Sequence, residues 1–151
     1  MRKHRQAPKK TLISDARWVA RHCAGLNIRL AARQITRFLD RKLAETGLSL
    51  AQFGLLTHIA SAADDTIGAL AERSGLDQST LSRNLRILEK AGLIEIAAVE
   101  ADLRRRAVWL TERGALRLEE AMPAWREADQ TLSEIITPQR IEELADKASA
   151  L

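Results

Sequence analysis

Residues 67–111 read IGALAERSGLDQSTLSRNLRILEKAGLIEIAAVEADLRRRAVWLT, and along this run the apolar spacing changes from helical to alternating. In its first part, Ala71, Gly75 and Leu81 have the spacing of a helix-turn-helix motif. The small side chain lets two helices cross closely, the glycine permits a positive φ in the turn, and the leucine anchors the second helix. The pattern therefore predicts two helices joined by a tight turn, over 67–74 and from 77 to about 91.

The outer face of the second predicted helix is basic and rich in hydroxyl groups. With successive residues about 100° apart, Leu81, Leu85 and Leu88 point inward together, and the opposite face has no acid at its centre. Arginine can bond guanine O6 and N7, while serine and threonine suit phosphates or base edges. Taken alone, such a stripe also fits a solvated helix face, but the preceding turn and following segment favour a recognition helix in a DNA groove. The candidate contacts are Gln78, Ser79, Thr80, Ser82, Arg83, Arg86 and Lys90.

From Leu93 onward, apolar residues recur at every second position, which is typical of β-strands. Ile94 and Ile96 share one face of a predicted strand over 93–99. A second strand over 106–110 carries Val108 and Leu110 on one face. We predict an antiparallel hairpin whose loop is the charged segment 100–105.

Three consecutive arginines beside the acid Asp102 mark this hairpin as a candidate wing. Such side chains can enter the narrow, negatively charged minor groove or bind phosphates. We therefore predict DNA contacts at Arg104, Arg105 and Arg106, with Asp102 in a structural role at the turn. A charged loop that only keeps the edge strands from aggregating is the alternative.

The remainder of the chain predicts helices on both sides of this unit. An apolar stripe spaced by three or four residues predicts one long helix over 14–46, which Gly47 ends, and Ser49 with Gln52 forms a capping-box pattern before another helix. Thr111 and Thr137-Pro138 open two further helices. The fold class is mainly α with a small β-hairpin. We expect a disordered basic arm over 1–13, an N-terminal dimerisation helix over 14–46, a winged helix-turn-helix region over 47–110 and C-terminal dimerisation helices over 111–151.

The composition is that of a globular protein, with 46% hydrophobic and 29% charged residues in 151. The net charge of +4 comes from the first ten residues, which hold five of the 24 basic residues and no acid, so bulk charge alone identifies no partner. No apolar run approaches the ~20 residues of a membrane span, and the N-terminus lacks the apolar core of a signal peptide. We expect a cytoplasmic protein without a membrane partner.

The co-occurrence of these motifs resembles the MarR family of transcriptional regulators. The resemblance rests on the recognition-helix pattern, Asp102-Leu103-Arg104 in the wing, and Leu110-Thr111-Glu112-Arg113-Gly114 at the next helix. It implies a homodimer built from the first and last helices, each lobe placing a recognition helix in a major groove and a wing in a minor groove of double-stranded DNA. It also implies repression, less often activation, relieved by a small-molecule effector or by oxidation.

Two sets of residues are candidates for sensing. Cys23 is the single cysteine, and the chain has no tyrosine, the residue that activates the reactive cysteine in the family's peroxide-sensing branch. Inert packing is therefore the default for Cys23, and redox sensing is the alternative. A possible ligand crevice would be lined by Gln34, Phe38, Phe53, Thr57 and His58.

Enzymatic function has little support in the sequence, and no cofactor or metal site is expected. The three histidines are far apart and lack metalloprotease spacing, and there is no P-loop, no Gly-x-Ser-x-Gly and no dinucleotide-binding glycine motif. The serious alternative is a winged helix that contacts proteins without binding DNA. Arginines on both the recognition helix and the wing favour the DNA-binding interpretation over that alternative.

Overall fold

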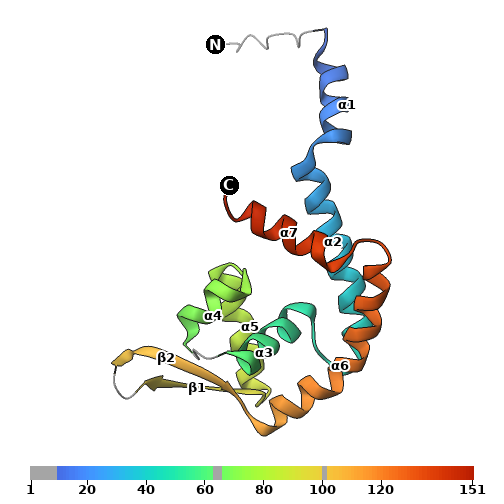
Figure 1. Ribbon diagram of the computed structural model, residues 1–151. Helices are drawn as coiled ribbons and strands as arrows, with labels where there is room; N and C mark the ends of the chain where they lie inside the picture. The colour runs from blue at the N-terminus through green and yellow to red at the C-terminus, as the bar shows by residue number, and fades with distance from the viewer. Residues whose placement is uncertain (1–9, 63–65, 100–101) are drawn as a thin grey trace, which may run out of the picture. The chain divides into compact units, whose positions relative to one another are not determined.

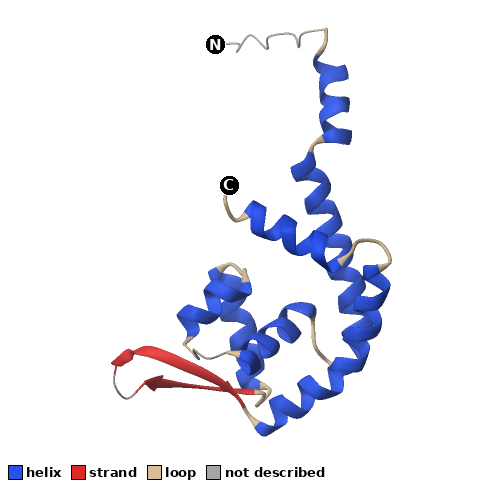
Figure 2. Ribbon diagram, viewed as in Figure 1, coloured by secondary structure: helices blue, strands red, loops and turns tan. Residues whose placement is uncertain are grey.

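The computed structural model describes residues 10–62, 66–99 and 102–151, and it gives side-chain positions for these except residues 99 and 102–105. Figures 1 and 2 show a mainly helical chain with one antiparallel hairpin, which confirms the predicted fold class. The elements are α1 (Leu12–His22), α2 (Ala24–Leu43), the 3₁₀ helix η1 (Ala44–Thr46), α3 (Leu50–Ser61), α4 (Ile67–Ser74), α5 (Gln78–Lys90), β1 (Ile94–Val99), β2 (Asp102–Leu110), α6 (Glu112–Ser133) and α7 (Pro138–Ala148).

The chain divides into two compact units, one ending at Arg37 and the other beginning at Phe38. In the first unit the prediction of a single long helix is wrong, because the helix breaks at Cys23. That residue has an extended ψ of 112°, and the Asn27 side chain donates to the carbonyl of Arg21 at 3.1 Å. The amide thus replaces a backbone donor that the break removes, a local competition that an apolar stripe does not reveal.

In the second unit, the predicted capping box forms at the start of α3. Ser49 Oγ accepts from the Gln52 backbone N–H at 3.2 Å, and Gln52 Oε1 accepts from the Ser49 N–H at 3.0 Å. Leu48 and Phe53, on either side of this cap, are both buried. The start of α3 is therefore fixed by its sequence signature, as expected.

The helix-turn-helix forms where it was predicted. Thr66 caps α4, and Gly75 after α4 has a φ of +61°, in the left-handed region that glycine adopts without strain. Leu70 on α4 and Leu81 on α5 are both fully buried in one cluster with the leucines of α3. The two helices thus share the main core, and that core fixes which face of α5 is exposed.

The hairpin is partly different from the prediction. From Ile94 opposite Leu110 to Ala98 opposite Arg106 the register is regular, but Val99 then pairs with Asp102. Residues 102–105, predicted as part of the loop, therefore belong to β2, and three of them lie in a bulge without a partner on β1. An isolated bridge between Thr66 and Ala107 ties β2 to the residue before α4. The strand β2 also contacts α3 and α4, and β1 contacts α5, so the hairpin packs on the helix-turn-helix (Figure 2).

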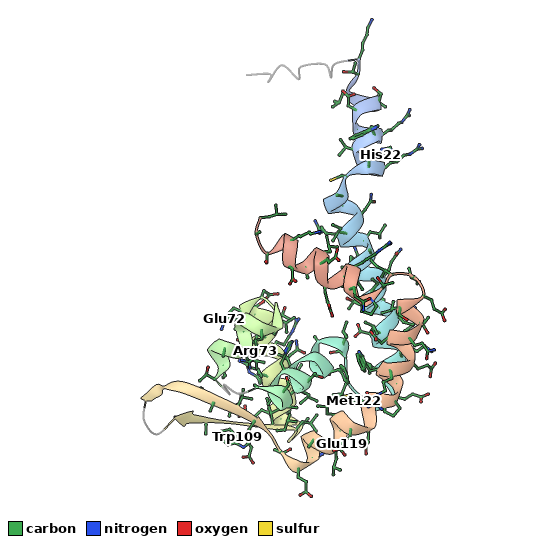
Figure 3. The ribbon with its side chains drawn as sticks, in the orientation of Figure 1. His22, Glu72, Arg73, Trp109, Glu119 and Met122 are labelled. Atoms are coloured by element: carbon green, nitrogen blue, oxygen red, sulfur yellow. The ribbon has the colours of Figure 1, made fainter. Side chains whose placement is uncertain are left out.

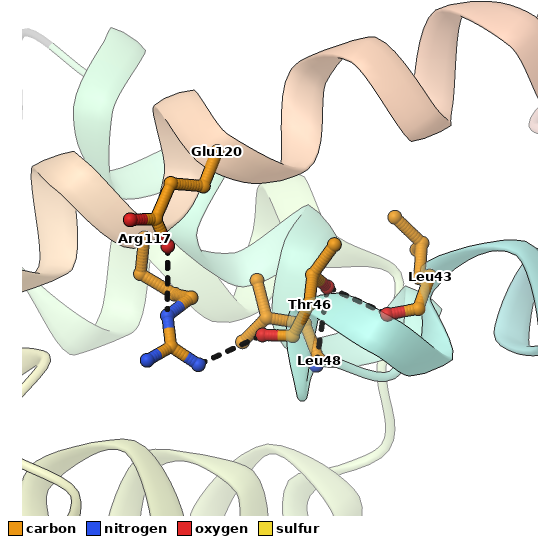
Figure 4. Close-up of polar contacts among 5 residues, drawn as sticks. All are labelled: Leu43, Thr46, Leu48, Arg117 and Glu120. Atoms are coloured by element: carbon orange, nitrogen blue, oxygen red, sulfur yellow. Dashed lines mark hydrogen bonds and ion pairs between the residues drawn. The ribbon is translucent and has the colours of Figure 1, made fainter.

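The long helix α6 follows from Thr111, whose side chain accepts from the Gly114 N–H at 3.0 Å. Further along, Arg117 Nη1 donates to the carbonyl of Thr46 at 2.8 Å, and its Nε lies 3.5 Å from Glu120 Oε2 (Figure 4). The bond to Thr46 joins α6 to the segment before α3, and the pair with Glu120, within α6, orients the Arg117 side chain. The final helix, α7, has Pro138 at its start and no buried residue.

Candidate nucleic-acid interface

The orientation of α5 is set by its buried face. Leu81, Leu85 and Leu88 are buried as predicted, and Asn84 joins them with 8% of its surface exposed. Its side-chain amide donates to the carbonyl of Thr80 at 2.9 Å. Asn84 was not among the predicted residues, and only its position between the leucines on a helical projection could have indicated its burial. The opposite face of α5 must therefore point to solvent.

That opposite face carries the predicted contacts. Arg83, Arg86 and Lys90 are exposed, and none of them forms an ion pair within the described part of the chain. Gln78, Ser79 and Ser82 are also exposed, whereas Thr80 is half-buried. An exposed row of unpaired cations costs little in water and is available to polyanions. We call Arg83, Arg86 and Lys90 the cationic stripe.

At the amino end of α5, three side chains form a hydrogen-bonded group. Asp77 Oδ1 accepts from Ser79 Oγ at 2.6 Å and from the Thr80 N–H at 2.9 Å, and Asp77 Oδ2 accepts from Thr80 Oγ1 at 2.7 Å. The bond from Ser79, followed by those from Thr80, holds the pKa of the Asp77 carboxyl far below its usual range. The carboxylate is therefore ionised at neutral pH.

The hairpin reaches α5 through the turn after Lys90 and through contacts between α5 and β1. Arg106 lies on β2 opposite Ala98, and its side chain is exposed. The backbone of Asp102, Arg104 and Arg105 lies in β2, while their side chains fall outside the described part. The expected wing contacts at Arg104 and Arg105 and the structural role of Asp102 thus stay predictions.

The outer face of the hairpin carries a pair that the sequence analysis did not identify. Trp109 Nε1 donates to Glu95 Oε2 at 3.1 Å across the two strands. Trp109 is 39% exposed and lies on the face away from the helices (Figure 3). Glu89, Gly92 and Thr111 border the same open depression, of about 460 Å³. The Trp109–Glu95 hydrogen bond thus links β2 to β1 on the outer face of the hairpin.

The residues of the predicted ligand crevice are not gathered in one place by the described contacts. Phe53 belongs to the core, with its ring stacked on Trp125 at a centroid distance of 6.0 Å. Thr57 Oγ1 donates to the carbonyl of Phe53 at 2.9 Å, within its own helix. Phe38 and His58 are half-buried. The fifth residue, Gln34, is exposed and belongs to the first unit.

Cys23 is half-buried at the break between α1 and α2. Trp18 and His22, on the preceding turn of α1, stack at a centroid distance of 4.8 Å, and His22 Nδ1 lies 2.8 Å from the carbonyl of Trp18. His22 thus has its partners within α1. Among residues 10–62, 66–99 and 102–151, His, Cys, Asp and Glu form no group of three that could hold a metal ion.

A helix-turn-helix followed by a two-stranded hairpin that packs on it defines a winged helix-turn-helix protein. The family model described as MarR family matches residues 46–105. The transcriptional regulator MosR of M. tuberculosis, solved in complex with DNA, is 33% identical to this chain, with 85% of this chain and 96% of MosR covered and a TM-score of 0.77. The chain belongs to the MarR family.

Two other solved relatives have the same fold. A mutant of MarR from E. coli, complexed with operator DNA, is 25% identical to this chain and has a TM-score of 0.74. The match covers 88% of this chain and 96% of the MarR chain. MepR of S. aureus, in a complex with DNA, is 24% identical over 85% of this chain and 98% of its own, with a TM-score of 0.73. The comparison with curated protein sequences gives no match. Fold and family are thus those of transcriptional regulators and not of enzymes.

Within the described part of the chain, every helix is too short or too polar to cross a lipid bilayer.

Proposed function

We propose that this protein binds duplex DNA through α5 and the β1–β2 hairpin and regulates transcription, most directly as a repressor. The observation that carries the proposal is the cationic stripe: Arg83, Arg86 and Lys90 are exposed together on α5, without ion-pair partners in the described residues. The exposed Arg106 extends this basic character to β2. The DNA complexes of MosR, MarR and MepR support the same assignment.

The protein is proposed to act as a homodimer. In the first unit, large apolar side chains lie exposed along α1 and α2, among them Trp18, Leu26 and Leu30. In the second, Ile141 and Leu144 on α7 are exposed as well. Apolar surface on this scale is unfavourable in water and is typical of surfaces that associate. A two-fold dimer would read a pseudo-palindromic operator with half-sites about one helical turn, ~10 bp, apart.

A salt titration of duplex binding tests the DNA-binding proposal. With full-length protein and a labelled duplex pool, contacts to ~6–10 phosphates per dimer would make the affinity fall by about 10³-fold or more between 50 and 200 mM salt. Fluorescence anisotropy measures this slope. A module that contacts only proteins would show no duplex affinity at either salt concentration, and that result would refute the proposal.

Control by a small ligand is the finer part of the proposal. A ligand that binds one spacing of the two DNA-binding lobes better than another would shift the dimer between competent and incompetent states. Of the lining candidates, only Phe53 is buried in the core, and Phe38, Thr57 and His58 are half-buried and so partly accessible. A thermal-shift screen with small aromatic acids tests this, and peroxide treatment of the wild type and of Cys23→Ser in the same screen tests the redox alternative.

A further inference from the structure

The amino end of α5 presents hydroxyl groups whose hydrogen atoms are already used. Ser79 Oγ lies 2.6 Å from Asp77 Oδ1, and Thr80 Oγ1 lies 2.7 Å from Asp77 Oδ2. An ionised carboxylate has no proton to donate, so in both bonds the hydroxyl must be the donor. The depressed pKa of Asp77 agrees with this assignment.

A hydroxyl has one hydrogen and two lone pairs. With their hydrogens directed at Asp77, Ser79 and Thr80 can only accept further hydrogen bonds. The backbone N–H of Thr80 is also occupied, since it donates to Asp77 Oδ1 at 2.9 Å. We call Asp77, Ser79 and Thr80 the acceptor tip, because together they present lone pairs and a negative charge to a ligand. The N–H of Thr80 cannot donate to a phosphate, since it is already bonded to Asp77.

In the major groove, hydrogen-bond donors are few. Cytosine N4 and adenine N6 carry amino groups, whereas guanine O6 and N7 and thymine O4 are acceptors, like every phosphate oxygen. Ser79 is exposed and Thr80 is half-buried, so Ser79 is the member of the acceptor tip that a base can reach. An acceptor at this position pairs with an amino group and is repelled by the other groups.

We propose that Asp77 is a positioning residue for specificity: by holding the Ser79 hydroxyl as an acceptor, it makes the tip of α5 recognise the exocyclic amino group of a cytosine or adenine. The proposal rests on the DNA-binding function proposed above. The sequence alone allowed Ser79 to contact either a phosphate or a base edge, and this proposal assigns it to a base edge. Attraction to the DNA phosphates is then left to cations further along, such as the exposed Lys90 at the other end of α5.

Base analogues that lack the amino group test the proposal. Full-length protein first selects its binding site from a random duplex library. Each cytosine of the half-site is then replaced by pyrimidin-2-one and each adenine by purine, and affinities are measured. We expect one position at which the loss of the amino group weakens wild-type binding by about 3- to 10-fold, the range of one hydrogen bond. Ser79→Ala should bind more weakly by a similar factor and be indifferent to the analogue at that position.

Asp77→Asn separates the role of the carboxylate from that of the cap, since asparagine caps helices as well as aspartate does. In aspartate one oxygen, Oδ1, accepts both the Thr80 N–H of the cap and the Ser79 hydroxyl. The amide oxygen of asparagine is neutral and must still cap Thr80, so it holds the Ser79 hydrogen less firmly than the carboxylate does. This variant should therefore weaken the preference for the amino group, while its overall affinity for the duplex changes no more than that of a variant that loses a negative charge elsewhere on α5. Glu89→Gln, which removes a negative charge near the other end of α5, is the matched control and should keep the preference.

Two results would overturn the inference while leaving DNA binding intact. In one, no analogue affects the wild type at any position of the selected site. In the other, replacing a single phosphate by methylphosphonate abolishes the difference between wild type and Ser79→Ala, which would show that Ser79 donates to the backbone. A protein that enriches no sequence and shows no salt-dependent duplex affinity would refute both the inference and the proposed function.

Discussion

Gly114, in the first turn of α6, sits directly against the backbone of Leu93, the residue that precedes β1. A Cβ built on Gly114 would overlap the carbonyl oxygen of Leu93 and lie 2.8 Å from its carbonyl carbon. That carbonyl already accepts the N–H of Thr111 at 3.1 Å. The two ends of the hairpin are therefore closed against each other through backbone atoms, and no side chain can be added between them.

Gly114→Ala should accordingly unfold the second unit or destabilise it by about 3 kcal/mol, the upper end of the usual cost of overpacking, because neither the Leu93 carbonyl nor α6 can move without breaking that bond. Gly54→Ala is the matched control: its Cβ would meet nothing within 4 Å. In a helix interior the change from glycine should stabilise by about 0.5–1 kcal/mol. Urea unfolding followed by circular dichroism measures both. Equal stability of the two variants would show that the close approach is relaxed in solution.

A second prediction concerns Thr111, which lies between β2 and α6. Its hydroxyl donates to the carbonyl of Gly92 at 2.7 Å and accepts the N–H of Gly114 at 3.0 Å. Thr111→Val removes both bonds at nearly constant shape and should cost about 1–2 kcal/mol, as the loss of a good N-cap does. Thr137 is also an N-cap but makes no side-chain cap bond. Thr137→Val should therefore change the free energy of unfolding by less than about 0.5 kcal/mol, and a larger effect there would contradict this account.

The pH dependence of stability should report on Asp77. Its pKa is depressed in the folded state by the bonds from Ser79 and Thr80, so its contribution is present above the unfolded-state pKa, about 3.9, and is lost as the pH falls below that value. The stability difference between wild type and Asp77→Asn should be constant above about pH 5 and shrink from about pH 4 downward. Unfolding curves between pH 7 and pH 2.5 measure it. A difference that grew on acidification would have the wrong sign.

Arg83 and Arg104 should differ in what they contribute to binding. Arg83→Ala should cost about 1–3 kcal/mol and relax specificity at one base position if the side chain reads guanine. Arg104→Ala should weaken binding with less effect on the major-groove preference, as expected for a contact in the minor groove or to phosphate. Arg126→Ala, an exposed arginine on α6, is the control. Competition against operator variants measures the difference, and an equal, sequence-blind loss from both would contradict it.

The features that could be predicted are those fixed by residues close in sequence. Ser49 with Gln52, Gly75, and Asp77 each determine a cap or turn through neighbours two or three positions away, and the helices begin and end accordingly. The break at Cys23 was missed because Asn27 competes for a backbone carbonyl on the other side of it. The bulge in β2 was missed because an alternating pattern indicates faces but not register.

In the candidate site, too, some features could be predicted from the sequence and others could not. The exposure of Arg83 and Arg86 follows from the helical period alone. The direction of the Ser79 hydroxyl does not, because it depends on the geometry of the Asp77 side chain after the cap has formed. Spacing therefore locates a recognition surface, while its hydrogen-bond polarity needs coordinates.

A final prediction concerns association. Ile141 and Leu144 lie on α7 with 43% and 48% of their surfaces exposed, and α7 buries none of its residues within the chain. If a second copy covers them, Ile141→Glu should place a charge in an apolar interface and shift the protein toward monomer. Sedimentation velocity over a range of concentrations measures this, with Gln139→Glu on the same helix as the control for added charge. A two-fold dimer would engage two half-sites, so Ile141→Glu should also lose affinity for a full operator relative to a single half-site. A variant that remains as associated as the wild type would exclude α7 from the interface.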